Sequence, residues 1–189
     1  FNLDHLTKGN VKVEMSKLLF FNKHFLQKRI ENKTQLEELV TIVTPKIAEE
    51  FAINEDDMLR DKVKIILKDC GHSLSTINEF EVKFSFFFKQ PDYSVRPEPT
   101  EKFIQSINKE SVITILESLG KNVESSNVDS KINTIKRKFQ TNNKNIFQSI
   151  RFALSGTVSG AKIHVMLDIL GKEESQLRIA NAIEYLKSM

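Results

Sequence analysis

Several residue types are scarce in this 189-residue chain, and each scarcity excludes a class of protein. There is one cysteine, Cys70, so no disulfide can form within the chain, which suits a reducing compartment. Six glycines and four prolines are too few for a collagen-like or disordered chain. The most apolar stretch, Phe84–Phe88, is far shorter than the roughly 18 residues that cross a membrane. We therefore expect a folded protein with a core of its own and no membrane partner.

Acidic residues are absent from one long segment, residues 130–167. The whole chain has a formal net charge of +3, but this segment alone carries seven basic side chains. They are Lys131, Lys136, Arg137, Lys138, Lys144, Arg151 and Lys162. Lysine and arginine attract phosphate and gain from the release of its counterions, so the segment favours a nucleic acid as partner. The alternative is a solvated basic face without a partner.

Apolar residues recur at the spacing of an α-helix along nearly the whole chain, and alternation of period two is absent. One such stripe runs from Leu36 to Ile47. The run Ile77–Phe88, where apolar residues step by three and four, is expected to be helical too. A last helix is expected from about Glu173 to Leu186. The pattern predicts an all-α protein.

Three of the four prolines, Pro91, Pro97 and Pro99, lie within nine residues of one another. Proline removes a backbone donor and disfavours helix in the residue before it, so residues 90–99 are expected to be extended. This division predicts a first helical subdomain at residues 1–90, a proline-containing connector at 91–99, and a second helical subdomain at 100–189.

Glycine and asparagine mark expected helix ends. Gly120 and Gly171 follow apolar runs, and we interpret both as helix C-caps, because glycine adopts the left-handed backbone conformation common there. The asparagine-rich segment Thr141–Asn145 is expected to be a turn.

The sequence reveals no catalytic site and no metal site. Its four histidines are scattered, and Cys70-Gly71-His72 lacks the second ligand pair of a zinc site. The glycines of Gly156–Gly160 lack the Lys-Ser/Thr of a phosphate-binding loop. We expect neither catalytic residues nor metal ligands in this chain.

An ordered series of motifs fills the last third of the chain, and its segments are Arg151–Gly156, Ser159–Gly160, Leu170–Glu173 and Arg178–Ile179. The series resembles the end of bacterial-type glutamyl-tRNA synthetases. Those proteins have an Arg-x-Ala-Leu-Thr/Ser-Gly turn, a Gly-Pro helix start, and a Leu-Gly-Lys-Glu sequence before a final Arg-Ile/Leu helix.

The first thirty residues carry an independent match to the same family. Its segments are Phe1–Leu3, Lys17–Leu18, Phe21–Asn22 and Phe25–Leu26, which are similar to the entry of that family's anticodon-binding region. Three segments resemble the mitochondrial branch in particular: Phe21–Asn22, Leu26–Lys28 and Gly71–His72. The resemblance implies the mitochondrial matrix as the location, with the bacterial cytoplasm as the alternative.

The resemblance implies that the chain is part of a glutamate–tRNA ligase. The chain starts at Phe1 without an initiator methionine or a signal peptide, which predicts a processed chain or a fragment. In the family, a class I catalytic domain with two ATP motifs would lie upstream of Phe1. ATP would bind there, and this chain alone is expected to hold no cofactor and to be inactive. What remains resembles the anticodon-binding region, two packed helical subdomains that bind tRNA(Glu).

The same resemblance implies roles for single residues. Arg151, Gly160, Ala161, Ile163 and His164 match family positions that touch the anticodon loop, while the remaining basic side chains of 130–167 would hold the phosphate backbone. Ala161 stands where proline is usual, and His164 where an aromatic residue is common. An alternative role for Arg151 is to fix the turn between two helices.

A further departure concerns the third anticodon base. Family members that discriminate at this base use an arginine, and our alignment puts Ser73 there, with no arginine between Arg60 and Arg96. This predicts that tRNA(Gln) is accepted as well as tRNA(Glu). The alternative is an alignment displaced by a residue or two in this loop.

The rival function is an all-α scaffold that binds a protein partner and has no role in tRNA charging. Neutral replacements of Lys136, Arg137 and Lys138 separate the two functions, because only an RNA binder should lose affinity and salt dependence.

Overall fold

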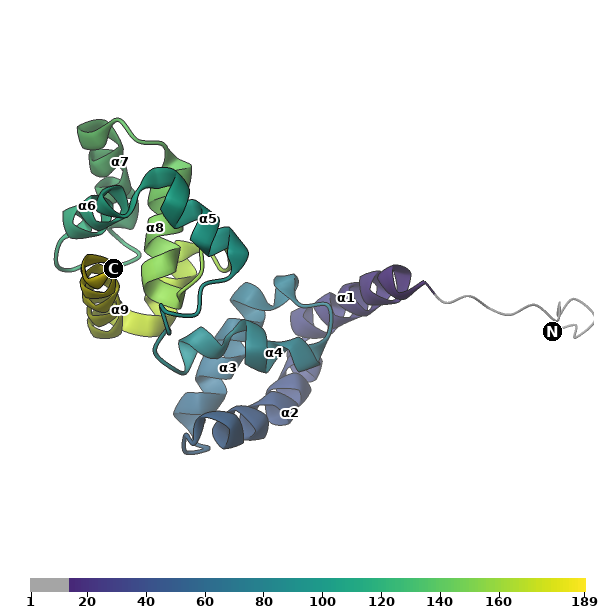
Figure 1. Cartoon of the computed structure of the whole chain (residues 1–189). Coiled ribbons are helices and arrows are strands. Elements are labelled where there is room, and N and C mark those ends of the chain that lie inside the picture. Colours follow the sequence, from purple (N-terminus) through teal and green to yellow (C-terminus); the bar gives the residue numbers. More distant parts are fainter. Residues whose placement is uncertain (1–13) are drawn as a thin grey trace, which may run out of the picture.

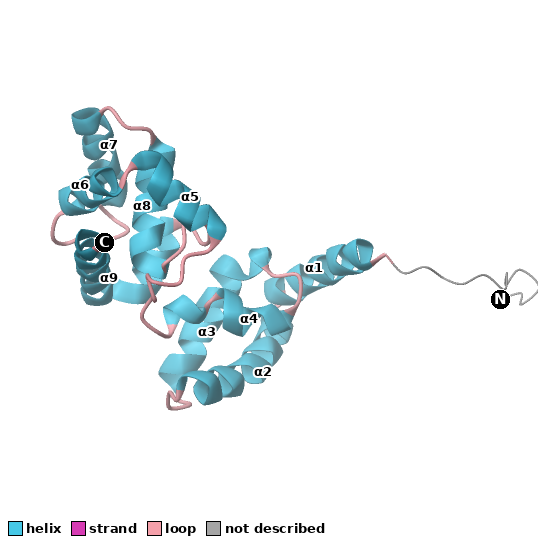
Figure 2. Ribbon diagram, in the orientation of Figure 1, coloured by secondary structure: helices cyan, strands magenta, loops and turns pink. Residues whose placement is uncertain are grey.

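A computed structural model describes residues 14–189, and its regular structure in that range is entirely helical (Figures 1 and 2). The α-helices are α1 (Met15–Glu31), α2 (Lys33–Phe51), α3 (Asp57–Cys70), α4 (Phe80–Lys83), α5 (Glu98–Ile107), α6 (Lys109–Leu119), α7 (Val128–Phe139), α8 (Asn143–Ser155) and α9 (Ile163–Ser188). Short 3₁₀ helices are η2 (Gly71–Ser73), η3 (Ile77–Glu79) and η4 (Ser85–Phe87). The all-α prediction is confirmed for the described residues. The motif at Phe1–Leu3 lies outside them.

Helices α1 to α4 form one group, which we call the first group (Figure 1). Side-chain caps start α2 and α3, since Asn32 Oδ1 accepts from Gln35 N at 3.1 Å and Asp56 Oδ1 accepts from Leu59 N at 2.8 Å. The apolar stripe of α2 is buried as predicted and packs against α3.

The phenylalanine-rich run at residues 77–88 is not one helix, so that prediction was wrong. It breaks into η3, α4 and η4. Carbonyl groups that a continuous helix would use internally are taken by side chains from elsewhere. Lys62 Nζ donates to the Phe87 carbonyl at 2.7 Å, and Arg178 donates to the Phe86 carbonyl at 2.6 Å. The short turns also let Phe80, Phe84 and Phe87 all be buried.

Helices α5 to α9 form the second group, in which α8 packs against α6, α7 and α9. Pro99 lies in the first turn of α5, where its missing N–H is no loss. The extended connector predicted to reach residue 99 therefore ends at Pro97. Gly120 ends α6 with a φ of 65°, as predicted. Gly171 has a φ of 75° and divides α9 into two helical segments, so its predicted role as a helix end is confirmed too.

The segment Thr141–Asn145 is a turn only at its start. Asn142 Oδ1 accepts from Asn145 N at 2.8 Å and so acts as the N-cap of α8, which already begins at Asn143. The predicted turn was therefore too long, because its asparagines cap and open a helix.

Arg178 joins the two groups. Its side chain is only 2% exposed, and it donates to two carbonyls of the first group, Phe86 at 2.6 Å and Lys89 at 3.1 Å. It also donates to the Leu154 carbonyl at 2.7 Å and to the carboxylate of Glu174 at 2.6 Å. One buried cation therefore satisfies backbone groups from both sides of the junction.

Tyr93 fastens the loop between the groups to the second group. Its hydroxyl lies 2.7 Å from the Ala153 carbonyl and 3.0 Å from the Arg178 carbonyl, and its one O–H hydrogen is shared between these two acceptors. Burial raises the pKa of Tyr93, which keeps this donor protonated.

Within residues 14–189, no helix is long and apolar enough to span a bilayer. The same residues bring together no group of three or more metal-ligating side chains. Cys70 is buried, and burial raises the pKa of its thiol to about 12, so it is not a reactive thiolate near neutral pH.

Candidate nucleic-acid interface

Arg151 lies in a surface hollow between α8 and the loop that follows it. We call this the Arg151 hollow; its lining includes Lys144, Phe147, Gln148, Arg151 and Gly160. The Arg151 Nε donates to the Ala161 carbonyl at 3.1 Å, which fixes the loop. Its two terminal nitrogens form no hydrogen bond with the described residues, so they remain available to a ligand. Both roles predicted for Arg151 are therefore open to the same side chain.

Partial burial lowers the pKa of Arg151, but an arginine remains charged at any physiological pH. A half-buried guanidinium is less hydrated than an exposed one, which strengthens its hydrogen bonds to a base edge or a phosphate. Phe147 in the same hollow is half-buried and offers an aromatic surface. The hollow thus combines a cation with a stacking face.

The loop from α8 to α9 carries the remaining predicted base contacts. Gly160 has a φ of 140°, a conformation that other residues avoid, and a Cβ there would meet nothing within 4 Å, so the backbone is open to approach. Ala161 is half-buried and Lys162 is exposed. The start of α9 falls at Ile163, a few residues after the Ser159–Gly160 segment that resembles the family's helix start.

The first turn of α9 has neither a side-chain cap nor an acidic residue. No side chain of the described residues therefore caps its first N–H groups, which suits an anion. Ile163 is 4% exposed and belongs to the core, so it positions this turn and is not a surface contact. His164 is partly exposed, and its Nε2 lies 3.2 Å from the carboxylate of Asp129.

The basic end of α7 lies next to the start of α8. Lys136, Arg137 and Lys138 are all exposed, and the Lys138 amine lies 5.0 Å from the centre of the Phe139 ring. Lys131, on the same helix, has a structural role instead. It donates to the carbonyls of Leu119 at 2.6 Å and Lys121 at 3.3 Å, and so caps the end of α6.

Ser73 lies apart from these residues, in η2 of the first group. The Ser73 hydroxyl donates to the Cys70 carbonyl at 2.9 Å, and Lys83 Nζ donates to the Ser73 carbonyl at 2.5 Å. Glu79 accepts from the backbone N–H groups of Ser75 and Thr76. The loop around Ser73 is therefore held in place by several hydrogen bonds.

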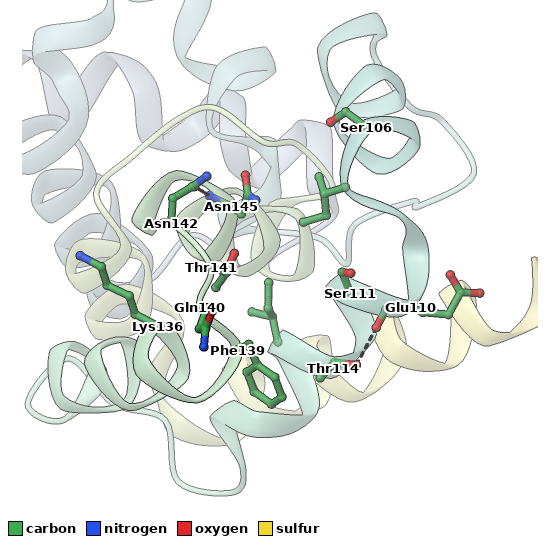
Figure 3. Close-up of a pocket in the computed structure, with 12 residues that line it drawn as sticks. Ser106, Glu110, Ser111, Thr114, Lys136, Phe139, Gln140, Thr141, Asn142 and Asn145 are labelled. Carbon is green, nitrogen blue, oxygen red and sulfur yellow. Dashed lines mark hydrogen bonds between the residues drawn. The ribbon is translucent and has the colours of Figure 1, made fainter.

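A second hollow, of about 770 Å³, lies between α6 and the turn that joins α7 to α8 (Figure 3). We call it the Gln140 hollow; Phe139, Gln140, Thr141, Asn145 and Ser111 are among its lining residues. Lys136, at the edge of the hollow, was predicted from the sequence as a basic contact, but the hollow itself was not. Its polar residues come from α5 and α6 on one side and from α7, α8 and the turn between them on the other, so no local motif could reveal it.

The family follows from comparison with known proteins. The sequence profile of the anticodon binding domain matches residues 35–183. This span contains both hollows and most of both helix groups, and the chain belongs to the anticodon binding domain family. The resemblance noted in the sequence is confirmed.

Two similar proteins are mitochondrial glutamate–tRNA ligases. The one from Saccharomyces cerevisiae is 41% identical over 190 residues, a match that covers 99% of this chain and 35% of the relative. The one from Schizosaccharomyces pombe is 26% identical over 192 residues, covering 99% of this chain and 36% of the relative. The chain thus spans about a third of the length of these relatives.

A solved structure shares the fold. It is a glutamate tRNA ligase from Elizabethkingia meningosepticum in complex with its amino acid, and it superimposes with a TM-score of 0.69 at 19% identity. The match covers 98% of this chain and 35% of that one.

Proposed function

We propose that this chain recognises the anticodon of tRNA(Glu) as part of a mitochondrial glutamate–tRNA ligase. The observation that carries the proposal is the Arg151 hollow, in which a half-buried guanidinium with unused donors faces solvent beside an aromatic ring. Single-stranded RNA is read by such combinations of stacking and hydrogen bonding. The 41% identity to a mitochondrial glutamate–tRNA ligase supports both the choice of tRNA and the mitochondrial matrix.

Each surface residue then has a role. Arg151, Gly160, Ala161 and His164 contact bases of the anticodon loop. Lys136, Arg137, Lys138, Lys144 and Lys162 hold the phosphate backbone, which fixes the register of the RNA without reading its sequence. Ile163 and Lys131 are left out, because one is in the core and the other caps α6.

The chemistry takes place elsewhere in a longer protein. ATP and glutamate bind in a catalytic domain that is not among these 189 residues. This chain supplies binding energy that aligns the acceptor end of the tRNA in that distant site. The two helix groups, joined by the loop between η4 and α5, act as two subdomains that bind one anticodon arm.

Ser73 extends the proposal to specificity. A serine whose hydroxyl is engaged with the Cys70 carbonyl offers no long cationic side chain to read the third anticodon base. The protein therefore accepts tRNA(Gln) as a second substrate.

The test is a fluorescence titration of the chain with tRNA(Glu) at two salt concentrations, beside a copy with a scrambled anticodon. Tighter binding to the true anticodon, weakening steeply with salt, is expected. Equal, salt-dependent binding to both RNAs would contradict the proposed base contacts and would mean that the chain binds only the phosphate backbone.

One observation favours the rival scaffold function. Helix α1 exposes large apolar side chains: Met15, Leu18, Leu19, Phe20, Phe21 and Phe25. Such a face marks a protein contact. If neither RNA binds, the scaffold becomes the better description of this chain.

A further inference from the structure

The Gln140 hollow has walls that suit a flat, uncharged, polar-edged ligand. Phe139 is half-buried and contributes an aromatic surface beside the apolar side chains of Ile107 and Ile115. In Figure 3, Thr141 and Asn145 lie on one side of the hollow and Ser111 on the other. The side chains of Gln140, Thr141, Asn145 and Ser111 form no hydrogen bond with the described residues, so their donors and acceptors are unused. A nucleobase has this combination of an aromatic face and a hydrogen-bonding edge.

Charge at the hollow also fits a nucleotide. Lys136 and Glu110 lie at opposite edges of the hollow (Figure 3). Lys136 has no carboxylate partner among the described residues, so a phosphate next to the base has a cation to meet. The walls between these two edges are neutral, which suits a base better than a phosphate.

Gln140 holds an unfavourable backbone conformation at this place. Its φ of 49° and ψ of 32° lie in the left-handed region, where α7 ends. Glycine or asparagine is usual at this position of a helix end, since other side chains raise the energy there. Strain of this kind concentrates at ligand-binding positions, because a particular side chain is needed despite it.

The two hollows lie on either side of the first turn of α8. Asn142 and Asn145 line the Gln140 hollow, whereas Asn143 and Lys144 line the Arg151 hollow. Successive nucleotides of one RNA strand can therefore reach both. Unpaired bases of a loop can be splayed apart, so neighbouring bases can enter separate sites.

We propose that the Gln140 hollow binds the base of an unpaired nucleotide of the bound tRNA, a different nucleotide from those at Arg151. This inference rests on the proposed function, since it needs an RNA loop at the start of α8. Phe139 stacks on the base, Gln140 and Asn145 bind its edge, and Lys136 meets its phosphate.

The test uses variants that keep the fold. Gln140→Gly relieves the backbone strain while it removes the side chain, so the free energy of unfolding should not fall. Its affinity for tRNA(Glu) is expected to drop about fivefold or more, as is that of Asn145→Ala. Asn133→Ala is the matched control, because Asn133 is exposed on α7 and lines neither hollow. Unchanged affinity in both Gln140→Gly and Asn145→Ala would overturn the proposal.

An abasic scan identifies the nucleotide. Each base of the anticodon loop is removed in turn from tRNA(Glu), and every RNA is titrated with the wild-type chain, Gln140→Gly and Arg151→Gln. One abasic position should weaken wild-type binding about tenfold but leave the affinity of Gln140→Gly unchanged. A second position should behave in this way with Arg151→Gln. If only the Arg151 position is found, the base site at Gln140 is wrong and the proposed function stands. If the wild-type chain binds no tRNA, both fail.

Discussion

The two helix groups differ in whether their basic side chains lie next to carboxylates. In the first group several of the cations are paired with carboxylates, among them Arg29 with Glu38 at 3.3 Å, and Lys64 with Glu37. The hydrogen bond from Lys64 is the main cause that lowers the pKa of Glu37. In the second group no carboxylate of the described residues pairs with Lys136 or its basic neighbours in 137–162. Surface charge that is already neutralised cannot bind phosphate, so the distribution of acids decides which cations are available to RNA.

The largest expected effect comes from cutting the junction between the groups. Arg178→Met leaves the carbonyls of Phe86, Lys89 and Leu154 without their donor and Glu174 without its cation. Removing one partner from a buried ionic network costs about 3–5 kcal/mol of the free energy of unfolding. Denaturant unfolding should show that loss, and separate transitions for the two groups.

The control for the junction is Lys187→Met, which breaks an exposed pair with Glu117. It should change the free energy of unfolding by no more than about 1 kcal/mol. Equal effects from the two variants would mean that Arg178 does not hold the groups together.

The next prediction compares the contribution to tRNA binding of one arginine from each group. Arg151→Gln should weaken binding of tRNA(Glu) by about 10- to 100-fold, since hydrogen bonds from a charged donor are lost. Arg29→Gln, from the first group, should bind as the wild type does, because its cation is paired with Glu38. Equilibrium titration measures both, and unfolding curves check that Arg151→Gln keeps its fold. A loss of stability without a loss of affinity would assign Arg151 to the turn alone.

A smaller effect tests the backbone contacts. The double variant Arg137→Gln/Lys138→Gln should lower the slope of log K against log salt by about 0.7 to 0.9 for each phosphate contact removed. Lys46→Gln/Lys64→Gln is the matched pair in the first group, where both amines lie by carboxylates. Its slope should equal that of the wild type. If the two double variants behave alike, the difference between the groups has no bearing on RNA.

The smallest effect concerns Ser73. Anticodons CUC and CUG should bind the wild-type chain with the same affinity, within about threefold, which is under 1 kcal/mol. Competition titration with two tRNAs that differ at this base alone measures the ratio. A tenfold or larger preference for CUC would contradict loose reading and point to a different residue at the third base.

Local chemistry made much of the fold predictable from the sequence. The buried stripe of α2, the end of α6 at Gly120 and the break at Gly171 depend on residues close in the chain, and they were predicted. The run at residues 77–88 was not, because donors from α3 and α9 capture its carbonyls. Helical spacing cannot register a hydrogen bond whose donor lies 92 residues away.

The candidate site, too, could be predicted only in part from the sequence. Sequence pointed to Arg151 and the basic segment, but it could not separate Lys131, which caps α6, from exposed lysines of identical charge. It noted Arg178 only as part of a motif, without the junction that it forms. The Gln140 hollow needs Ser111 of α6 beside the start of α8, and that proximity exists only after folding.

Tyr93 has a consequence for anyone who dissects this protein into pieces. The prolines suggest a cut at residues 91–99, with the second piece starting at about residue 100. That piece would lack the hydroxyl that serves the buried carbonyls of Ala153 and Arg178. A piece that starts before Tyr93 retains the hydrogen bonds of the Tyr93 hydroxyl. A second piece that keeps these two hydrogen bonds therefore has to start upstream of Tyr93, before two of the three prolines of the connector.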